Sequence, residues 1–259
     1  MAICASPNIR QNPLPRRVNN SQSKIICLDI ETAPILAYAW SFYDTNLIEE
    51  VEPWYILCVS WKELGSDKVH NISLRDFSGY KHNKKSDKAL CNEVHKLLSE
   101  YDIIVAHNGD AFDIKKLNAR FAYHGLTPPA PYKTVDTLKV ARQSFNTGNN
   151  KLKYLGGYFK LGAKLDPGGF ELWKGCMVGD NKSWNKMISY CNQDVRVLES
   201  LYLKIRPWVK NHPYIGEDRG SCPVCGSKNS QSRGMEKRTG GKLLRRLKCS
   251  DCGKYRYEK

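Results

Sequence analysis

The sequence predicts an α/β fold, in which a mixed β-sheet is flanked by helices, followed by a small cysteine-rich unit. Three observations support this class. Apolar runs of strand length alternate along the chain with segments that have helical spacing. Their order, β-β-β-α-β-α-β-α, is typical of a mixed sheet with helices on its faces. From about residue 216 the composition changes, because Cys, Lys and Arg become frequent and aliphatic side chains become rare.

The strands are expected mainly in the first half of the chain, where β-prone apolar runs are bounded by turn residues. The predicted strands are 25–32, 55–61, 68–74, 102–106 and 133–136. The first three of them are expected to form a meander. The aromatic-rich segment 33–53 between the first two is predicted to be irregular.

Helices are predicted where apolar residues recur every three or four positions. The predicted helices are 86–98, 113–123, 137–145, 152–161 and 184–209. The Gly-rich segment 162–182 is predicted to be irregular, and the polar residues 1–22 to be a disordered tail. We therefore expect one large domain over residues 23–212 and a separate small one over residues 216–259.

The charge of the chain favours a polyanionic partner. Lys+Arg number 41 and Asp+Glu 26, a net charge of +15, and nucleic acid is the simplest such partner. An anionic membrane is the alternative, but no apolar run is long enough to span a bilayer, and the N-terminus lacks the apolar core of a signal peptide. We expect a cytoplasmic protein with no membrane partner, in the host cytoplasm if the source is a virus.

Two carboxylates end the first predicted strand. In an extended strand, side chains at i and i+2 point to the same side, so Asp29 and Glu31 project together. Like charges that lie side by side on a core strand repel each other and are costly to desolvate. A divalent cation would neutralise the pair. The alternative is that both carboxylates simply face solvent at the strand end.

Two more acidic residues stand at helical positions. Asp113 opens the helix that follows the strand 102–106, where a helix cap is the simpler explanation. Asp194 lies in the middle of the long helix, on the same face as Tyr190, which precedes it by four residues. Asp is a poor helix former, and a partly buried one favours a cation nearby.

Taken together, these residues form three motifs: Asp29-x-Glu31, Asn108-x-x-x-Phe112-Asp113 and Tyr190-x-x-x-Asp194. In order, type and approximate spacing they resemble the DEDDy branch of the DEDD 3′→5′ exonucleases, over roughly residues 24–210. The segment 107–113 is most similar to the proofreading domains related to family B DNA polymerases. The resemblance implies an RNase H-like fold and metal-dependent release of nucleoside 5′-monophosphates from DNA, most simply single-stranded DNA. Exonucleolytic trimming of RNA is the alternative within the enzyme class.

The resemblance also implies roles for individual residues. Asp29, Glu31 and Asp194 would bind one Mg²⁺ or Mn²⁺, and Asp29 and Asp113 a second. Tyr190 would position the attacking water. Asn108, Phe112 and the backbone near Thr32 would contact the 3′-terminal nucleotide, although a core position for Phe112 is an equal alternative. Asp136, at the end of the strand 133–136, is predicted to cap the following helix.

The C-terminal cysteines form a strong metal-binding pattern. Two Cys-x-x-Cys pairs, separated by 23 residues, resemble a zinc ribbon with one structural Zn²⁺; they are Cys222, Cys225, Cys249 and Cys252. Four thiolates leave no open position on the metal for catalysis. Residues 216–259 hold 12 Lys/Arg and 5 Asp/Glu, and Lys242, Arg245 and Arg246 are predicted to bind nucleic acid. For the ribbon, a protein partner is the alternative to nucleic acid. For the whole chain, the alternative to an enzyme is a non-catalytic nucleic-acid-binding adaptor that acts through the zinc ribbon.

Overall fold

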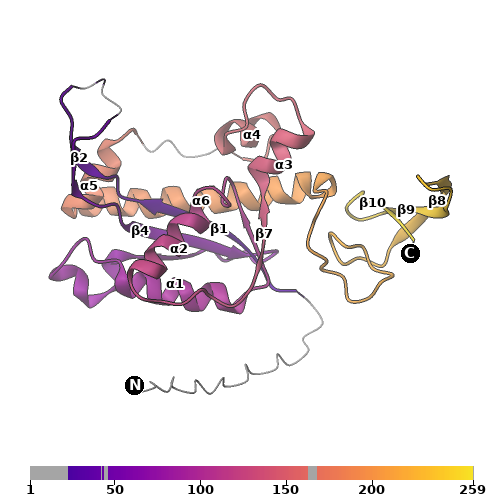
Figure 1. Ribbon diagram of the computed structural model, residues 1–259, viewed down its shortest axis with the longest axis horizontal. Coiled ribbons are helices and arrows are strands. Elements are labelled where there is room, and N and C mark those ends of the chain that lie inside the picture. Colours follow the sequence, from indigo (N-terminus) through magenta and orange to yellow (C-terminus); the bar gives the residue numbers. More distant parts are fainter. Residues whose placement is uncertain (1–22, 42, 44–45, 163–167, 259) are drawn as a thin grey trace, which may run out of the picture.

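The computed structural model describes residues 23–41, 43, 46–162 and 168–258, so the predicted tail over 1–22 lies outside the described residues. Five strands form a mixed sheet in the order β5-β4-β1-β6-β7 (Figure 1). They are β1 (Ile25–Thr32), β4 (Ile56–Glu63), β5 (His70–Ser73), β6 (Ile103–Ala106) and β7 (Lys133–Asp136). The first three pair antiparallel as the predicted meander, and β6 and β7 continue the sheet in parallel with β1. The predicted fold class is confirmed.

Helices cover both faces of this sheet. They are α1 (Lys88–Glu100), α2 (Asp113–Tyr123), α3 (Thr137–Ser144), α4 (Leu152–Tyr158), α5 (Glu171–Val178) and α6 (Asn181–Ile205). Ile26, Leu28 and Ile30 belong to an apolar cluster that includes α1 and α2. Ile25 and Cys27 belong to a second cluster, with α3, α4 and much of α6. Because side chains alternate along a strand, Asp29 and Glu31 lie on the face that α6 covers; in Figure 1, α6 runs above the sheet and α1 below it.

The prediction that 162–182 is irregular is wrong for α5, while residues 163–167 lie outside the described part of the chain. Glycine permits this helix to pack closely on α6, since a Cβ on Gly175 would lie 2.0 Å from Ser183 Oγ. Gly179, at φ 93°, ends α5 in the left-handed conformation that suits glycine. Asp180 then caps α6 by accepting a hydrogen bond from the Ser183 N–H at 2.8 Å.

The prediction that 33–53 is irregular is wrong in part as well. β2 (Leu36–Tyr38) and β3 (Glu49–Glu52) pair antiparallel as a separate hairpin. Most of its residues are exposed, so no period-two pattern of buried side chains marks it in the sequence.

A small three-stranded sheet forms the C-terminal part, in the order β10-β9-β8. Its strands are β8 (Ser230–Lys237), β9 (Leu243–Cys249) and β10 (Tyr255–Tyr257). The fully buried apolar residues here are Cys222, Val224 and Cys249, so four clustered cysteines take the place of a hydrophobic core. This part lies beyond the end of α6 (Figure 1), where the Lys254 ammonium donates to the carbonyls of Pro207 and Val209 at 2.9 and 2.8 Å.

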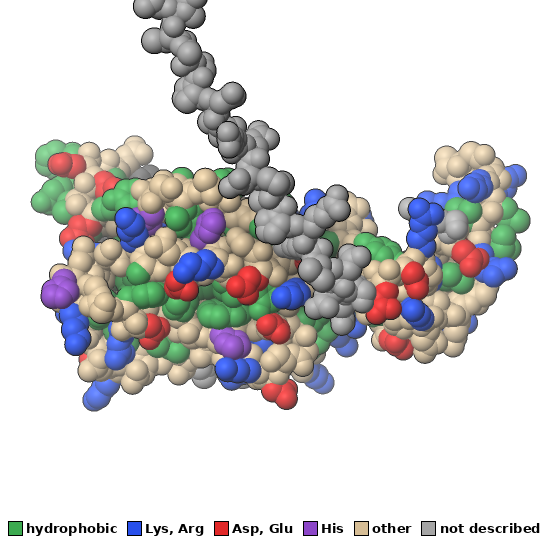
Figure 2. All heavy atoms as spheres, turned by 90° about the horizontal axis from the view of Figure 1, so that it is seen from below, with side chains coloured by type: hydrophobic (Ala, Val, Ile, Leu, Met, Phe, Trp, Pro, Cys, Tyr) green, Lys and Arg blue, Asp and Glu red, His purple; other side chains and the backbone are tan. Residues whose placement is uncertain are grey.

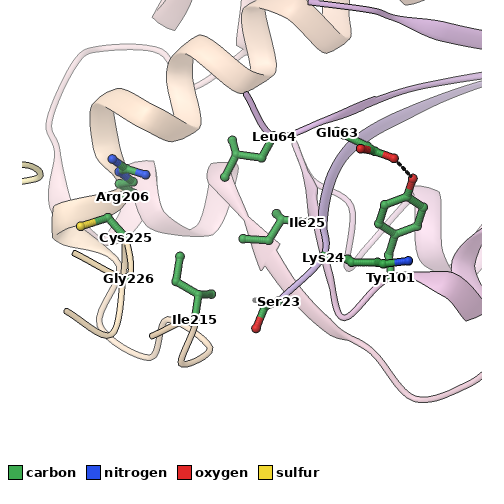
Figure 3. A pocket seen from close by; sticks show the side chains of 10 residues that line it. All are labelled: Ser23, Lys24, Ile25, Glu63, Leu64, Tyr101, Arg206, Ile215, Cys225 and Gly226. Carbon is green, nitrogen blue, oxygen red and sulfur yellow. Dashed lines mark hydrogen bonds between the residues drawn. The ribbon is translucent and has the colours of Figure 1, made fainter. Parts of the chain in front are cut away.

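A cavity of about 660 Å³ lies between the large sheet and the cysteine-rich part (Figure 3). Cys225, Gly226 and Ile215 line one side of it, opposite Lys24 and Tyr101. The Tyr101 hydroxyl donates to Glu63 at 2.6 Å. None of the predicted catalytic carboxylates lines this cavity, so it is separate from the predicted site.

Two global features bear on the partner of the chain. In the part of the chain that the structure describes, no helix combines the length and hydrophobicity needed to cross a bilayer. Figure 2 shows the face seen from below in Figure 1, on which Lys/Arg and Asp/Glu side chains are interspersed. The positive excess is therefore not gathered on that face.

Candidate active site

Three carboxylates from two elements converge above the sheet. Ligand oxygens of Asp29, Glu31 and Asp194 all lie within 4.8 Å of one another. Asp29 and Glu31 are half-buried near the end of β1, whereas Asp194 is 3% exposed in the middle of α6. The alternation of β1 and the contact between β1 and α6 therefore bring together side chains more than 160 residues apart in sequence.

Asp113 reaches the same end of β1 from the start of α2, which follows β6. Its Oδ1 accepts a hydrogen bond from the Ile30 N–H at 3.1 Å, so its carboxylate lies beside the backbone between Asp29 and Glu31. Phe112 occupies the cap position of α2 and Asp113 is the first helical residue, so the simpler explanation of Asp113 as the cap residue is wrong. Burial raises the pKa of its carboxyl to about 7, although hydrogen bonds such as the one from Ile30 act in the opposite direction.

The donor set fits divalent magnesium or manganese. All four groups are carboxylates, which are the oxygen ligands these hard cations prefer. Two of them, Asp113 and Asp194, are nearly fully buried, and a cation bound beside them would stabilise their charged forms. The chemistry of the four side chains, and the close approach of Asp29, Glu31 and Asp194, are therefore compatible with a divalent metal centre.

The loop before α2 is held in a specific conformation. Asn108 has φ 67°, in the left-handed region that non-glycine residues rarely occupy. Its N–H donates to Asp136 Oδ1 at 2.9 Å, and Asp136 also accepts from the Leu138 N–H at 3.0 Å, as the predicted cap of α3. Gly109 is required because a Cβ there would lie 2.3 Å from the Ala106 Cβ. Asp136 thereby fixes both the loop and the start of α3.

A cavity of about 990 Å³ opens over the carboxylates. The predicted site residues that line it are Asp29, Glu31, Asn108, Phe112, Asp113, Tyr190 and Asp194. Tyr190 is 8% exposed, with its ring edge-on to Trp173 of α5 at 6.2 Å between centroids. Phe112 is 38% exposed, which makes it available to the cavity rather than part of the core. Thr32, also among the described residues, does not line this cavity.

Several residues that line this cavity were not predicted from the sequence. Those with polar or charged side chains are His107, Arg142, Asn149, Asn150, Lys151 and Lys153. His107 Nε2 lies 2.9 Å from the Asn150 carbonyl and joins the loop before α2 to the segment before α4. One signal was present in the sequence: residues 137–160 contain five Lys/Arg and no Asp/Glu.

A thiol also touches the carboxylate group. Cys191, fully buried on α6, has its sulfur 3.4 Å from Asp29 Oδ2 and 3.6 Å from the Asp29 carbonyl oxygen. The S–H group donates to these oxygens, so it helps to hold Asp29 in place. Nothing in the local sequence distinguishes this cysteine from the other single ones.

The C-terminal cysteines converge as a tetrad whose ligand sulfurs lie within 4.8 Å of one another. The Cys222–Cys252 and Cys225–Cys249 sulfur pairs are each 3.6 Å apart. Sulfurs at the corners of a zinc tetrahedron with bonds of about 2.3 Å would be roughly 3.8 Å apart. Gly226 and Gly253 have φ 72° and 79° and donate to the carbonyls of Cys222 and Cys249. The cluster therefore has the turns and the spacing of a zinc site.

The predicted nucleic-acid-binding cations lie on this small sheet, away from the carboxylates. Lys242, Arg245 and Arg246 are exposed at or near β9. Arg245 lies 3.4 Å from Glu258, and Arg246 lies 3.4 Å from Glu236. The structure does not bring these three side chains to the cavity over the carboxylates.

Among the residues that the structure describes, a third cluster has metal-ligating residue types; it consists of Asp87, Cys91 and His124. Its carboxylate already accepts from Arg120 Nε at 2.7 Å and from the Ile56 N–H at 2.9 Å. His124 Nε2 lies 2.6 Å from the same carboxylate. A guanidinium at this position repels a cation, so the cluster is an ion-pair network that joins α1, α2 and β4.

Comparison with known proteins identifies the superfamily of the large domain. A model of the RNase H superfamily matches residues 63–206, more than half of the chain. Among solved structures, the chain is similar to the family B DNA polymerase from the hyperthermophilic archaeon Pyrobaculum calidifontis, with a TM-score of 0.47 and 17% identity. That match covers 71% of this chain and 25% of the polymerase, so the chain spans about a quarter of the polymerase's length. No curated protein matches this sequence.

Proposed function

The chain belongs to the RNase H superfamily, and we propose that it is a two-metal-ion 3′→5′ exonuclease of the DEDDy type. The observation that carries the proposal is the meeting of Asp29, Glu31 and Asp194 within 4.8 Å, with Asp113 bonded to the backbone between the first two. The substrate that we propose is single-stranded DNA, cleaved to nucleoside 5′-monophosphates. Residues 23–212 would form the exonuclease domain and residues 216–259 a zinc ribbon.

Asp29, Glu31 and Asp194 would hold one divalent cation, and Asp29 and Asp113 a second. Bound Mg²⁺ or Mn²⁺ supplies an activated water and stabilises the charge on the leaving oxygen. The protein itself provides orientation: β1 and α6 fix the carboxylates, and the Cys191 thiol holds Asp29. In this proposal the Tyr190 hydroxyl orients the attacking water. A phenol is too weak an acid to act readily as a base in its ionised form at neutral pH, so it is better suited to position the water than to remove the water's proton.

Asn108 and Phe112 are proposed to contact the terminal nucleotide. Both line the cavity over the carboxylates, and the left-handed backbone of Asn108 is fixed by Asp136. The rings of Phe112 and of a terminal base would stack, a contact that does not depend on the base. Thr32 is a weaker candidate, because it does not line the cavity.

The assay uses matched DNA and RNA oligonucleotides, labelled at the 5′ end and incubated with Mg²⁺ or Mn²⁺. We expect a ladder of products shortened from the 3′ end, with DNA cleaved faster than RNA. If RNA is cleaved faster than DNA, the proposed substrate is RNA and not DNA. Binding of both oligonucleotides without shortening in either metal would refute the exonuclease and leave a nucleic-acid-binding adaptor that acts through its C-terminal part.

A further inference from the structure

We propose that the strand leading to the 3′ end lies across an aromatic track, which runs from α4 to the end of α6. The track consists of five rings in contact: Tyr154, Tyr158, Phe159, Phe145 and Trp208. Its polarity, with the 3′ end at the carboxylates, rests on the exonuclease function proposed above. Its existence as a binding surface for single-stranded nucleic acid rests on the contacts, exposures and charges that follow.

The rings form an unbroken series. Tyr154 and Tyr158 stack with centroids 6.1 Å apart and planes at 21°. Phe159 follows edge-on to Tyr158 at 5.1 Å, and Phe145 lies 5.7 Å from Phe159. Trp208 completes the series at 5.4 Å from Phe145. Each step is a direct ring contact, so the track spans three separate chain segments without a gap.

The end rings are not core residues. Leu152, Leu155 and Gly156 form the buried side of α4, while Tyr154 and Tyr158 are 41% and 56% exposed. Trp208 is 50% exposed at the other end. Phe145 and Phe159 are half-buried and pack against the core, so they hold the exposed rings in place. Exposed rings at both ends of one series of ring contacts favour a binding role, because apolar surface left in water is unfavourable.

The charge beside the track selects the partner. Arg142, Lys151 and Lys153 line the cavity over the carboxylates, and Lys160 follows at the end of α4. No Asp or Glu occurs between Thr137 and Lys160. Cations interleaved with exposed rings are the pattern of proteins that bind single strands, in which phosphates meet the cations and bases stack on the rings. A protein partner would not require this one-sided charge.

The two ends of the track connect the two parts of the molecule. Lys151 and Lys153, at the start of α4, border the carboxylate cavity. At the other end, Trp208 lies next to Pro207 and Val209, whose carbonyls accept from Lys254 of the cysteine-rich part. A strand that follows the rings away from the carboxylates therefore reaches the base of the small, strongly basic sheet.

The test measures binding as a function of strand length. We would use the full chain with Asp29→Ala, to prevent cleavage, and labelled single-stranded DNA of about 3 or about 15 nucleotides, lengths that bracket a typical single-strand site. Fluorescence anisotropy gives Kd for each. Replacing both Tyr154 and Tyr158 by Ala should raise Kd for the longer strand by about 10- to 100-fold, since each stacked base contributes measurably. Kd for the shorter strand should stay unchanged.

Two matched variants serve as controls. Tyr154→Phe with Tyr158→Phe keeps both rings and should bind the longer strand as the parent does. Tyr123→Ala removes a tyrosine that is 69% exposed on α2 and should change neither Kd. Unchanged affinity of the double Ala variant for the longer strand, or an equal loss for both lengths, overturns the track.

This outcome is independent of the exonuclease proposal. A length-dependent loss of binding in the Asp29→Ala chain, together with a parent chain that cleaves no oligonucleotide, supports the track and refutes the nuclease. A cleavage ladder from the parent chain, with no length-dependent loss of binding in the double Ala variant, supports the nuclease and overturns the track.

Discussion

At the scale of single residues, burial of charge distinguishes this site. Asp113 and Asp194 are each 3% exposed, and they lie next to two further carboxylates on β1. Burying a carboxylate in its charged form is costly, because the protein interior solvates charge poorly. In the proposed site, shared divalent cations would lower that cost.

The first prediction follows from this shared site. Replacing Asp194 by Ala removes a ligand from α6 but leaves the exposed cations in place. We expect hydrolysis to fall by more than about 100-fold, since even residues behind the ligands of a metal cost about 10- to 100-fold when changed. Oligonucleotide binding, measured by anisotropy, should stay within about threefold of the parent, because most of that affinity comes from phosphate contacts.

Asp110→Ala is the matched control for this variant. Asp110 lies in the loop before α2, close in sequence to Asp113, but it does not line the cavity. Its Oδ2 accepts a hydrogen bond from the Lys139 ammonium at 2.7 Å. Its loss should leave the rate near that of the parent. Equal rates for the Asp194 and Asp110 variants would contradict the metal assignment.

At the scale of elements, Asp136 joins two of them. It caps α3 and also accepts from the Asn108 N–H of the loop before α2. We expect Asp136→Ala to lower the free energy of unfolding by about 2 kcal/mol, because a cap is lost and a partly buried N–H loses its partner. Urea denaturation measures this. Asp136→Asn retains a good cap and should lose less; an Ala variant within about 0.5 kcal/mol of the parent would rule out the joint role.

The elements that the sequence predicted well are those with a complete local signal. The bounds of α2 and β7 agree with the prediction, because apolar spacing, a following glycine and a β-branched run mark them. α5 was missed because Gly175, a poor helix former, serves a tertiary contact with Ser183 of α6. The hairpin of β2 and β3 was missed because it is exposed and acidic, without buried alternation.

The residues of the candidate site likewise fall into those that the sequence predicted and those that it did not. The convergence of Asp29, Glu31, Asp113 and Asp194 was inferred from motifs, each tied to a recognisable strand end or helix. The segment 149–153 was not inferred, because it reaches the cavity only through contacts such as that between His107 and Asn150. Cys191 is a similar case, since only the packing of α6 on β1 brings its sulfur to Asp29.

At the scale of the whole molecule, the two parts are stabilised in different ways. The large sheet has extensive apolar clusters, whereas the C-terminal sheet depends on its cysteines. We expect the parent to contain about one zinc per chain and Cys249→Ser to contain none, because three thiolates hold the metal poorly. Elemental analysis measures this. The C-terminal strands should become sensitive to protease while the five-stranded sheet still unfolds cooperatively.

Cys176→Ala is the control for that experiment. Cys176 is a buried single cysteine on α5 and should retain the zinc. Zinc retained by the Cys249 variant, or absent from the parent, would show that the tetrad is not a metal site.

A further prediction for the whole chain concerns the cations of the C-terminal sheet. If Lys242, Arg245 and Arg246 each neutralise a phosphate, replacing all three by Gln should reduce the slope of log K against log salt by about 2 for a single strand. Replacing the exposed Lys81, Lys96 and Lys182 by Gln removes the same charge elsewhere and should change the slope much less. An unchanged slope in the first variant would assign the small sheet to a protein partner instead.

The most direct measurement of the central claim is a crystal structure of the protein grown with Mn²⁺, with anomalous diffraction data collected at the manganese edge. The account predicts an anomalous peak coordinated by Asp29, Glu31 and Asp194, and a second one between Asp29 and Asp113 once an oligonucleotide is bound. Anomalous density that is absent from all four carboxylates, in crystals that contain manganese elsewhere, would contradict it.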